Sequence, residues 1–273
     1  MIIKNEFPIL EYSTDKVAVI NPDRDASKAG TSKPCRDDEG EVGFRRFPRL
    51  CLVTFFEEVL AGAVEKYQGI QIGFYDSEMK EFPVYRFTVD GTEICAVQAV
   101  VASGSIAMMT EMLYGCGVEV IVCCGGCGVL DDIPEGDVII PVRALRDEGA
   151  SYKYLPPARF IELQSGPIES FRNVLEGHGI PYIECATWST DGFYRETQEM
   201  VAYRREEGCK VVEMECATMA AIASFRGKTF GQMLYSGDIL TGSAEDYDDR
   251  DWSNNVSARE RLFSLALEAL CRL

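Results

Sequence analysis

The sequence predicts an α/β fold in which strands alternate with helices. From residue 94 onward, short apolar runs of strand length alternate with segments whose apolar residues recur at helical spacing. The chain has 273 residues, 47% of them hydrophobic and 26% charged, which is ordinary globular composition. It contains neither an internal repeat nor an interdomain linker, so we expect one domain over residues 1–273.

The first half of the chain is predicted to be irregular at its start and regular afterwards. Within residues 1–50 the apolar run Val17–Ile20 predicts one strand, followed by a long loop or flap. Segment 51–67 has helical spacing and stops near Gly69. Strands are predicted next, and the Asp90-Gly91 pair predicts a two-residue hairpin between the last two of them; the strand segments are 70–75, 84–89 and 94–101.

The second half is predicted to alternate between the two element types. Helices are expected over residues 105–117, 167–177, 196–207, 216–227 and 256–272. Strands are expected over residues 119–130, 137–145, 209–215 and 229–237. Such alternation indicates helices packed on the faces of a sheet.

Charge and cysteine usage exclude several classes of function. With 27 Lys and Arg against 44 Asp and Glu, the formal net charge of −17 opposes binding to nucleic acid or to an anionic membrane surface. No run of 18 apolar residues is present, and the N-terminus lacks the apolar core of a signal peptide. Eleven cysteines, an odd number scattered over predicted strands and helices, indicate reduced thiols and a cytoplasmic protein.

The most informative stretch is VVEMECATMAAIASF, residues 211–225. Glu213 and Glu215 are two apart, so on one strand they would share a face. Like charges on a buried strand are unfavourable unless something binds them, and strand ends at the carboxyl edge of α/β sheets are where ligands bind. Carboxylates there suit a sugar, because they accept hydroxyl hydrogen bonds and stabilise a cationic sugar transition state. A solvated strand end is the alternative interpretation.

The sequence VEMECATM resembles the VEME-type motif of nucleoside phosphorylase family 1, which includes uridine phosphorylase and hexameric purine nucleoside phosphorylase. Other blocks are similar, in the family's order: INPDR (20–24), IVCCGGCGVLDDIPEGDVIIPVRALRDEGASYKYLPP (121–157) and TWSTDGFYRET (187–197). The block RDEGASYKYLPP is closest to the bacterial uridine-phosphorylase-like branch. The resemblance implies a central mixed, partly barrel-like β-sheet flanked by helices.

The resemblance also implies roles for individual residues. Glu215 would bind the ribose 2′- and 3′-hydroxyls, Met214 would pack beneath the sugar, and Glu213 would make a supporting ribose contact. Residues Gly126 and Cys127, in the glycine-rich turn, would line the substrate site.

The base would be held by the loop that follows residue 190. Phe193 would stack on the base with Tyr194 beside it. Arg195 and Glu196 fall near the position where uridine enzymes hold uracil through a Gln and an Arg, but that Gln-x-Arg arrangement is missing. Uracil specificity is therefore not expected.

Asp238, in LYSGDIL, matches the position where purine enzymes of the family carry an Asp that protonates N7 of the leaving base. A purine leaves poorly as an anion, so a general acid lowers the barrier. An Asp here favours a purine-like base. The alternative is a capping aspartate in a helix or loop.

The phosphate site departs from the family pattern. Arg24 is in place to bind phosphate bidentately. However, the family's second phosphate arginine corresponds to Cys123, its glycine before the arginine to Ile20, and its Gly-x-Gly turn to Val100–Ala102. Compensation by Arg45, Arg46 or Arg49, including from a neighbouring subunit, is one alternative, and water as the nucleophile is another.

Metal, redox and histidine chemistry have little support in the sequence. Cys124 and Cys127 form a CxxC, but no second CxxC or His pair completes a zinc site. His178 is the single histidine and lies in a predicted surface turn, which excludes Ser–His and Cys–His mechanisms. We therefore expect no metal and no organic cofactor.

The sequence thus predicts a nucleoside phosphorylase that uses phosphate as co-substrate to release a free base and ribose 1-phosphate, with Asp238 and Glu215 as catalytic residues. Two alternatives stay open: a phosphate-independent nucleosidase and a nucleoside-binding protein without turnover. By resemblance, we expect a homodimer or a hexamer, with no nucleic-acid or membrane partner.

Overall fold

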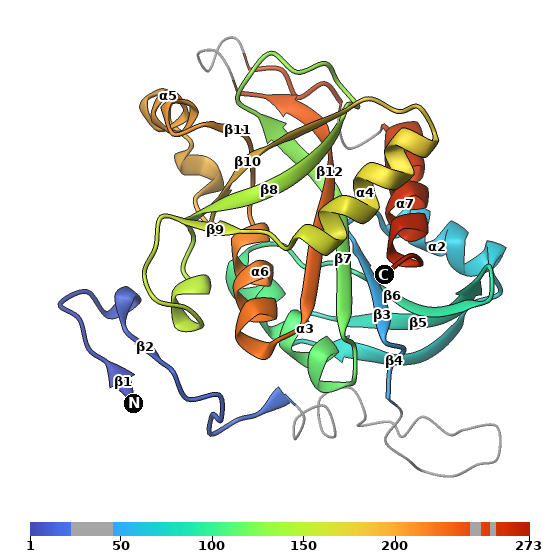
Figure 1. Cartoon of the computed structure of the whole chain (residues 1–273), viewed down its shortest axis with the longest axis horizontal. Coiled ribbons are helices and arrows are strands. Elements are labelled where there is room, and N and C mark those ends of the chain that lie inside the picture. Colours follow the sequence, from blue (N-terminus) through green and yellow to red (C-terminus); the bar gives the residue numbers. More distant parts are fainter. Residues whose placement is uncertain (23–45, 241–246, 252–254) are drawn as a thin grey trace.

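The computed structural model describes residues 1–22, 46–240, 247–251 and 255–273 (Figure 1). One mixed sheet organises most of these residues. Its strands follow the order β11-β10-β8-β12-β7-β3-β6-β5-β4, with β9 paired to β8. The strands are β3 Leu50–Thr54, β4 Ile70–Asp76, β5 Glu81–Val89, β6 Thr92–Gln98, β7 Val120–Val129, β8 Val138–Asp147, β9 Phe160–Glu162, β10 Tyr182–Thr190, β11 Cys209–Glu213 and β12 Thr229–Ile239.

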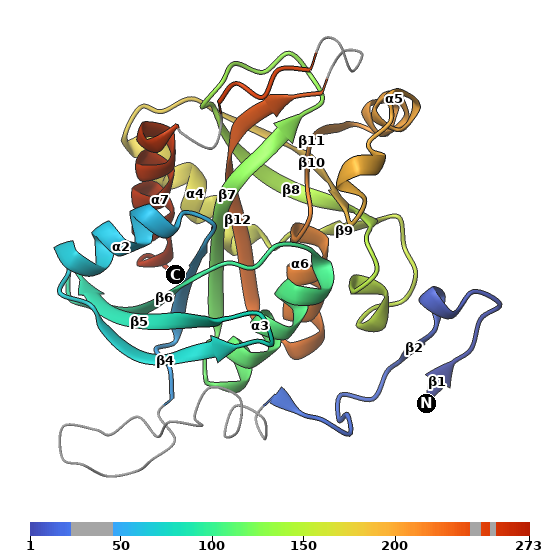
Figure 2. The same cartoon turned by 180° about the vertical axis from the view of Figure 1, so that it is seen from behind.

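Half of this sheet closes on itself. Strand β11 pairs in parallel with β10 and antiparallel with β7, where Val211 faces Val129 and Val212 faces Gly128. Strands β7, β12, β8, β10 and β11 therefore form a ring, while β3, β6, β5 and β4 extend the sheet away from it (Figure 2). The implied mixed, partly barrel-like sheet is confirmed.

Helices cover the sheet and pack against one another in pairs. The helix α4 packs on α7, and α3 packs on α6 (Figure 1). Glycine at 231 lets β12 pass close to α4, since a Cβ there would lie 2.4 Å from Pro167. The helices are α2 Glu57–Lys66, α3 Ser103–Gly115, α4 Ser165–Gly177, α5 Gln198–Glu206, α6 Cys216–Arg226 and α7 Val256–Leu270; single turns of 3₁₀ helix are η1 Pro8–Leu10, η2 Ser151–Lys153 and η3 Phe193–Arg195.

The N-terminal segment lies outside this arrangement as a separate two-stranded ribbon of β1 (Ile2–Ile3) and β2 (Tyr12–Ser13). Lys153 attaches it by donating from Nζ to the backbone oxygens of Pro8 (2.9 Å) and Ile9 (3.2 Å). The predicted strand at 17–20 is wrong. These residues pair with no strand among those described, and their apolar side chains are largely exposed.

Two further predictions concern the turn at Asp90-Gly91 and residues 51–67. The hairpin at Asp90-Gly91 is confirmed, with φ of 48° and 83° between β5 and β6. The predicted helix over 51–67 is wrong at its start, because Leu50–Thr54 form a fully buried strand between β6 and β7 and the helix begins only at Glu57. A short apolar run buried on both faces has no alternation that would distinguish it from a helix. Strand β10 has no counterpart in the predicted elements.

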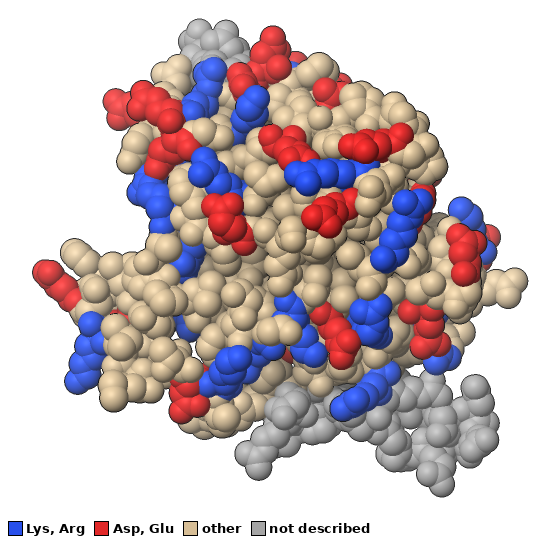
Figure 3. All heavy atoms as spheres, viewed as in Figure 1, with Lys and Arg blue, Asp and Glu red and all other residues tan. Residues whose placement is uncertain are grey.

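The surface carries charges of both signs over the face seen in Figure 3, with acidic and basic side chains interspersed. Within the described part of the chain, no helix is long and apolar enough to cross a membrane.

Candidate functional site

Glu213 is the last residue of β11 and is held by four protein donors. Its Oε1 accepts hydrogen bonds from the hydroxyls of Thr187 (3.2 Å) and Ser189 on β10. Its Oε2 accepts from the backbone N–H groups of Glu215 (2.8 Å) and Cys216 (2.6 Å), which begin α6. The carboxylate thus caps the helix and is 93% buried, with all its lone-pair sites occupied by protein.

Glu215 has fewer protein partners than Glu213. Its Oε1 accepts from the backbone N–H of Ala102 at 2.7 Å, and its Oε2 accepts from the N–H of Met214 at 3.3 Å. Two lone-pair sites remain for a ligand. Burial, followed by the nearby charge of Glu213, raises the pKa of Glu215 to about 8.

The prediction that Glu213 and Glu215 share the face of one strand is wrong. Strand β11 ends at Glu213, and Glu215 is the N-cap residue of α6 with φ −131° and ψ −29°. The two carboxyls come together because Glu213 turns back to bond the N–H of Glu215. Their position at the carboxyl end of the strand is as predicted.

The N-terminus of α3 also contributes to the site, because the N–H of Ala102 bonds Glu215. Ala102, its N-cap residue, has φ 74° and ψ 154°, a conformation that only glycine adopts without strain. At the next residue, Asp191 accepts from the backbone N–H (3.1 Å) and the hydroxyl (2.7 Å) of Ser103, and it also accepts from the N–H of Gly149 at 2.9 Å. Protein carboxylates therefore already bond the first two N–H groups of this helix end.

Asp238 lies at the end of β12, beside the end of β7. Tyr247 donates a hydrogen bond to its Oδ2 at 3.3 Å, and burial raises the pKa of this half-buried carboxyl above its ordinary value. Gly128 makes room for it, since a Cβ there would lie 3.3 Å from Asp238 Oδ1 and 2.6 Å from Leu240. A larger residue at that point of the strand would have to displace the Leu240 side chain.

Gly126 and Cys127 lie toward the end of β7, the strand that pairs with both β11 and β12. Cys127 is buried, its Sγ donates to the backbone oxygen of Tyr235 at 3.3 Å, and Gly126 packs against the Tyr235 ring. Burial raises the pKa of Cys127 well above its ordinary value, with further increases from Cys185, Asp238 and Glu213. This end of β7 lies between β11, which carries Glu213, and β12, which carries Asp238.

The loop after β10 carries the predicted base-binding residues. Phe193 and Tyr194 contact each other edge to face, with ring centroids 5.0 Å apart, and both are exposed, Phe193 at 52% and Tyr194 at 92%. Arg195 is also exposed, whereas Glu196 is half-buried. Burial and then the charge of Asp238 raise the pKa of Glu196 to about 7, so this loop approaches Asp238.

The structure describes only some of the residues considered for the phosphate site. Arg24 and Arg45 lie outside the described residues. Cys123 is fully buried in the middle of the sheet, where it pairs with Val53 of β3 and Gln232 of β12. Its thiol has a pKa well above the ordinary value because of burial, and Glu215 and Glu213 contribute.

Two site residues were not singled out from the sequence. Asp191 stands in the TWSTDGFYRET block, so the motif was recognised while its carboxylate was given no role. Tyr247 lies in the acidic run 245–251, which has no distinctive spacing. Among the described residues, no group of three or more His, Cys, Asp or Glu side chains is arranged to hold a metal ion.

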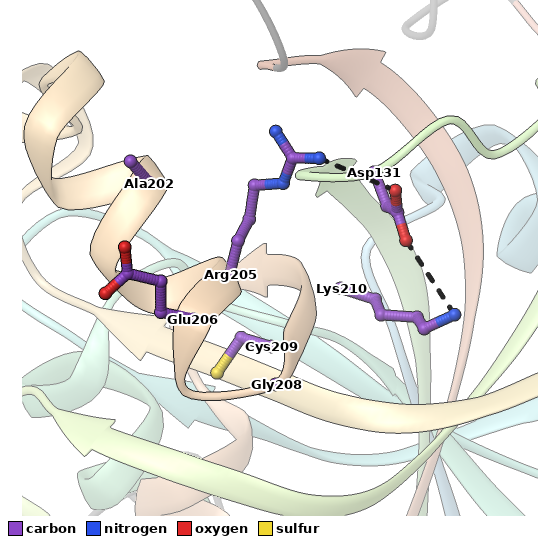
Figure 4. Close-up of a pocket in the computed structure, with 7 residues that line it drawn as sticks. All are labelled: Asp131, Ala202, Arg205, Glu206, Gly208, Cys209 and Lys210. Atoms are coloured by element: carbon purple, nitrogen blue, oxygen red, sulfur yellow. Dashed lines mark ion pairs between the residues drawn. The ribbon is translucent and has the colours of Figure 1, made fainter.

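A separate cavity of about 470 Å³ lies beside α5 and β11 (Figure 4). Arg205 and Lys210 both point toward Asp131 there, each 3.8 Å from one of its oxygens. These three side chains form ion pairs with one another on the surface, away from the β11–α6 site.

The fold and the site together define an α/β protein with acidic groups at the carboxyl ends of its strands. The chain belongs to the phosphorylase superfamily, whose sequence model matches residues 49–271. Guanosine phosphorylase of Halorubrum lacusprofundi is 29% identical over 213 residues, which cover 72% of this chain and 86% of that protein.

Solved structures show the same fold. Uridine phosphorylase from Vibrio fischeri superposes with a TM-score of 0.73 at 21% identity, covering 90% of this chain and 99% of that one. AMP nucleosidase from Bacteroides thetaiotaomicron superposes with a TM-score of 0.66 at 20% identity, covering 82% and 87%. The expected family is confirmed, and membership supports an enzyme that acts on nucleosides.

Proposed function

We propose that this protein cleaves the N-glycosidic bond of purine ribonucleosides by phosphorolysis, releasing the base and ribose 1-phosphate. The observation that carries the proposal is the contrast between two adjacent carboxyls. Glu213 is saturated by four protein donors, whereas Glu215 is buried and bonded by two backbone N–H groups only. A buried carboxyl with free acceptor sites and a shifted pKa is typical of a functional group.

Glu215 binds the ribose in this proposal. In the complex its remaining lone pairs accept the 2′- and 3′-hydroxyls, and these donors, together with the positive charge that develops on the sugar, favour the ionised carboxylate. The negative charge of that carboxylate stabilises the sugar as the bond breaks. Glu213 acts through Glu215, because its hydrogen bonds fix the turn that presents Glu215. Met214, between them, packs beneath the sugar.

Asp238 serves as the general acid. Burial raises its pKa, which favours the protonated form that can donate to a leaving base. Phe193 covers the base, with Tyr194 and Arg195 at the entrance of the pocket. A purine requires such protonation more than uracil does, and the similarity to a guanosine phosphorylase supports a purine.

Phosphate is the acceptor, with Arg24 as its ligand. The named curated relatives support phosphorolysis, since the guanosine phosphorylase and the purine nucleoside phosphorylase of Photobacterium profundum, at 27% identity over 59% of this chain, both carry that activity in their names.

Hydrolysis is the second candidate, and one observation favours it. Asp191 and Glu215 occupy the N-terminal amides of α3, and the buried Cys123 supplies no positive charge at the position of the family's second arginine. A phosphate dianion beside these carboxylates needs cationic support that water does not need.

The test is product analysis. The purified protein would be incubated with guanosine, inosine, adenosine and uridine, with and without phosphate, and ribose 1-phosphate and free ribose would be quantified. Phosphate-dependent formation of ribose 1-phosphate from purine nucleosides supports the proposal. Free ribose formed at the same rate without phosphate identifies a nucleosidase, and base release from none of the four excludes both candidates.

A further inference from the structure

The N-terminus of α3 is capped by a residue from another part of the chain. Ala102 occupies the N-cap position, where its methyl side chain offers no acceptor to the first N–H groups of the helix. Asp191, in the loop after β10, supplies the acceptor. Its Oδ1 accepts from the Ser103 N–H at 3.1 Å, and its Oδ2 accepts from the Ser103 hydroxyl at 2.7 Å. An exposed aspartate is therefore bonded to a helix end 88 residues away in the sequence.

Asp191 is held in turn by the loop that follows β8. The Gly149 N–H donates to its Oδ2 at 2.9 Å. The neighbouring Glu148 is buried, and its Oε2 accepts from the Thr218 hydroxyl at 2.7 Å and from two backbone N–H groups at the start of η2. Thr218 lies in the first turn of α6, the helix for which Glu215 is the N-cap residue. The hydrogen bonds around Asp191 therefore lead back to the helix that Glu215 begins.

Ala102 lies between two carboxylates on consecutive backbone N–H groups. Its own N–H donates to Glu215 Oε1 at 2.7 Å, and the N–H of the next residue donates to Asp191. Its φ of 74° and ψ of 154° are unfavourable for a residue with a Cβ, so the surrounding contacts must hold it in this conformation. Without Asp191, the backbone at Ala102 can relax by rotation, and such a rotation carries its N–H away from Glu215.

We infer that Asp191 is a positioning residue for Glu215: by bonding Ser103, it keeps Ala102 in the conformation whose N–H orients the ribose-binding carboxyl. This inference rests on the proposed function, because it concerns the carboxyl to which that function assigns the ribose. Asp191 acts through the peptide and not on the substrate. A cap that only stabilised α3 would lower the stability of the protein and leave the rate of each folded molecule unchanged.

The kinetic test is a double-mutant cycle on Asp191 and Glu215. The kcat for guanosine in phosphate buffer would be measured per folded molecule for the natural protein, Asp191→Ala, Glu215→Gln and the double variant. Asp191→Ala should lower kcat by about 10- to 100-fold, since a small displacement of a positioned group has effects of this size. In the Glu215→Gln background the same substitution should lower kcat by less than about threefold, because both residues act through one carboxyl.

Asp147→Ala is the matched control. Asp147 ends β8, and its Oδ2 accepts from Trp188 Nε1 and from the Arg204 guanidinium, each at 2.9 Å. Its removal therefore also deprives protein donors of a carboxylate, but neither of these donors belongs to α3 or α6. Asp147→Ala should lose stability and keep its kcat.

Two kinetic results would overturn the inference while leaving nucleoside cleavage intact. One is an unchanged kcat in Asp191→Ala, and the other is a double variant in which the two single losses multiply. If Asp191→Ala does not fold, Ser103→Ala takes its place under the same criteria. It removes the hydroxyl donor alone, so its expected loss is smaller, about three- to tenfold.

A measurement without substrate separates this inference from the proposed function, which fails if no nucleoside is cleaved. Burial raises the pKa of Glu215 to about 8, so the N–H that bonds it should report its titration by NMR. In protein labelled with ¹⁵N-alanine, the Ala102 amide signal is identified by its loss in Ala102→Gly. This signal should shift with pH in the natural protein and in Asp147→Ala, and Asp191→Ala should lose most of the shift. A shift of equal size in Asp191→Ala, or none in the natural protein, would overturn the inference.

The groups around Glu215 allow this titration to be assigned. The other carboxyls that act on it are Glu213 of β11 and Asp191 itself. Burial raises the pKa values of the thiols of Cys123 on β7 and Cys216 on α6 well above their ordinary range. Glu215→Gln should therefore abolish the shift of the Ala102 signal near pH 8, and a shift that persists in this variant would also overturn the inference.

Discussion

The backbone N–H of Ala102 donates to Glu215 Oε1 at 2.7 Å across 113 residues of sequence. This hydrogen bond joins the N-terminus of α3 to that of α6, and it orients the carboxyl assigned to the ribose. Ala102 makes it from φ 74° and ψ 154°, a region that side-chain-bearing residues avoid. Strained backbone that persists next to a buried acid is expected where the geometry serves a site.

Ala102→Gly should stabilise the protein. Relief of the strain is worth about 1–3 kcal/mol, and the greater flexibility of glycine in the unfolded chain offsets about 0.5–1 kcal/mol of it. Urea denaturation should therefore show a gain of about 1 kcal/mol. The matched control is Ala61→Gly in the exposed middle of α2, which should lose about 1 kcal/mol. A loss of stability in Ala102→Gly equal to that of the control would show that the position is unstrained.

Glu213→Gln should destabilise the fold far more than Glu215→Gln. The amide replaces one acceptor oxygen with a donor that faces two protein donors, so hydrogen bonds to Ser189 and Thr187 or to the start of α6 are lost. The expected cost is about 2–4 kcal/mol in the free energy of unfolding, measured by urea denaturation. Equal stabilities of the two variants would contradict the assignment of Glu213 to positioning.

Stability should fall as pH rises toward 8, in part because of Glu215. Its folded-state pKa of about 8 lies above the ordinary 4.5, so between these values the folded protein keeps a proton that the unfolded chain has lost. Since the folded state binds more protons in this window, raising the pH favours unfolding. The free energy of unfolding at about pH 5 and about pH 8 should differ less in Glu215→Gln than in the natural protein.

The control for that experiment is Glu65→Gln, an exposed carboxylate on α2. It should show the same pH slope as the natural protein. An unchanged slope in Glu215→Gln would mean that Glu215 is ionised in the folded state throughout this range.

Asp238→Asn should slow the cleavage of substrates whose leaving group must be protonated, and it should spare substrates whose leaving group departs as an anion. With purine nucleosides, loss of the general acid should lower kcat by about 10²- to 10⁴-fold. With 4-nitrophenyl β-D-ribofuranoside, whose phenolate leaves without protonation, the variant should retain most of its rate. Equal losses on both substrates would indicate that Asp238 holds the fold or the sugar rather than protonating the base.

Prediction of elements from the residue pattern succeeded where one pattern admits one structure. Asp90-Gly91 required positive φ at two positions, and the small-residue run after Glu215 became α6. It failed where burial on both faces removes periodicity, as in Leu50–Thr54, and where exposed apolar residues such as Val19 imitate a strand. Both failures arise because the burial of a segment depends on the tertiary structure, which the local sequence pattern does not record.

In the candidate site, some residues could be identified from the sequence, whereas their contacts depend on the folded chain. Glu213, Glu215 and Asp238 were singled out from the sequence because motif and chemistry agree on acidic residues at strand ends. The different hydrogen bonding of Glu213 and Glu215 depends on hydroxyls of β10, a strand that was missed. Likewise, the bond from Asp191 to Ser103 joins residues 88 apart, and only the folded chain brings them together.

The most direct test of the central claim is base release from guanosine in phosphate buffer, followed side by side for the natural protein and Glu215→Gln. The proposal predicts phosphate-dependent release of guanine by the natural protein and a rate lower by about 100-fold or more in the variant, since it loses the charge that stabilises the sugar cation. Absence of release from the natural protein, or an undiminished rate in Glu215→Gln, would contradict it.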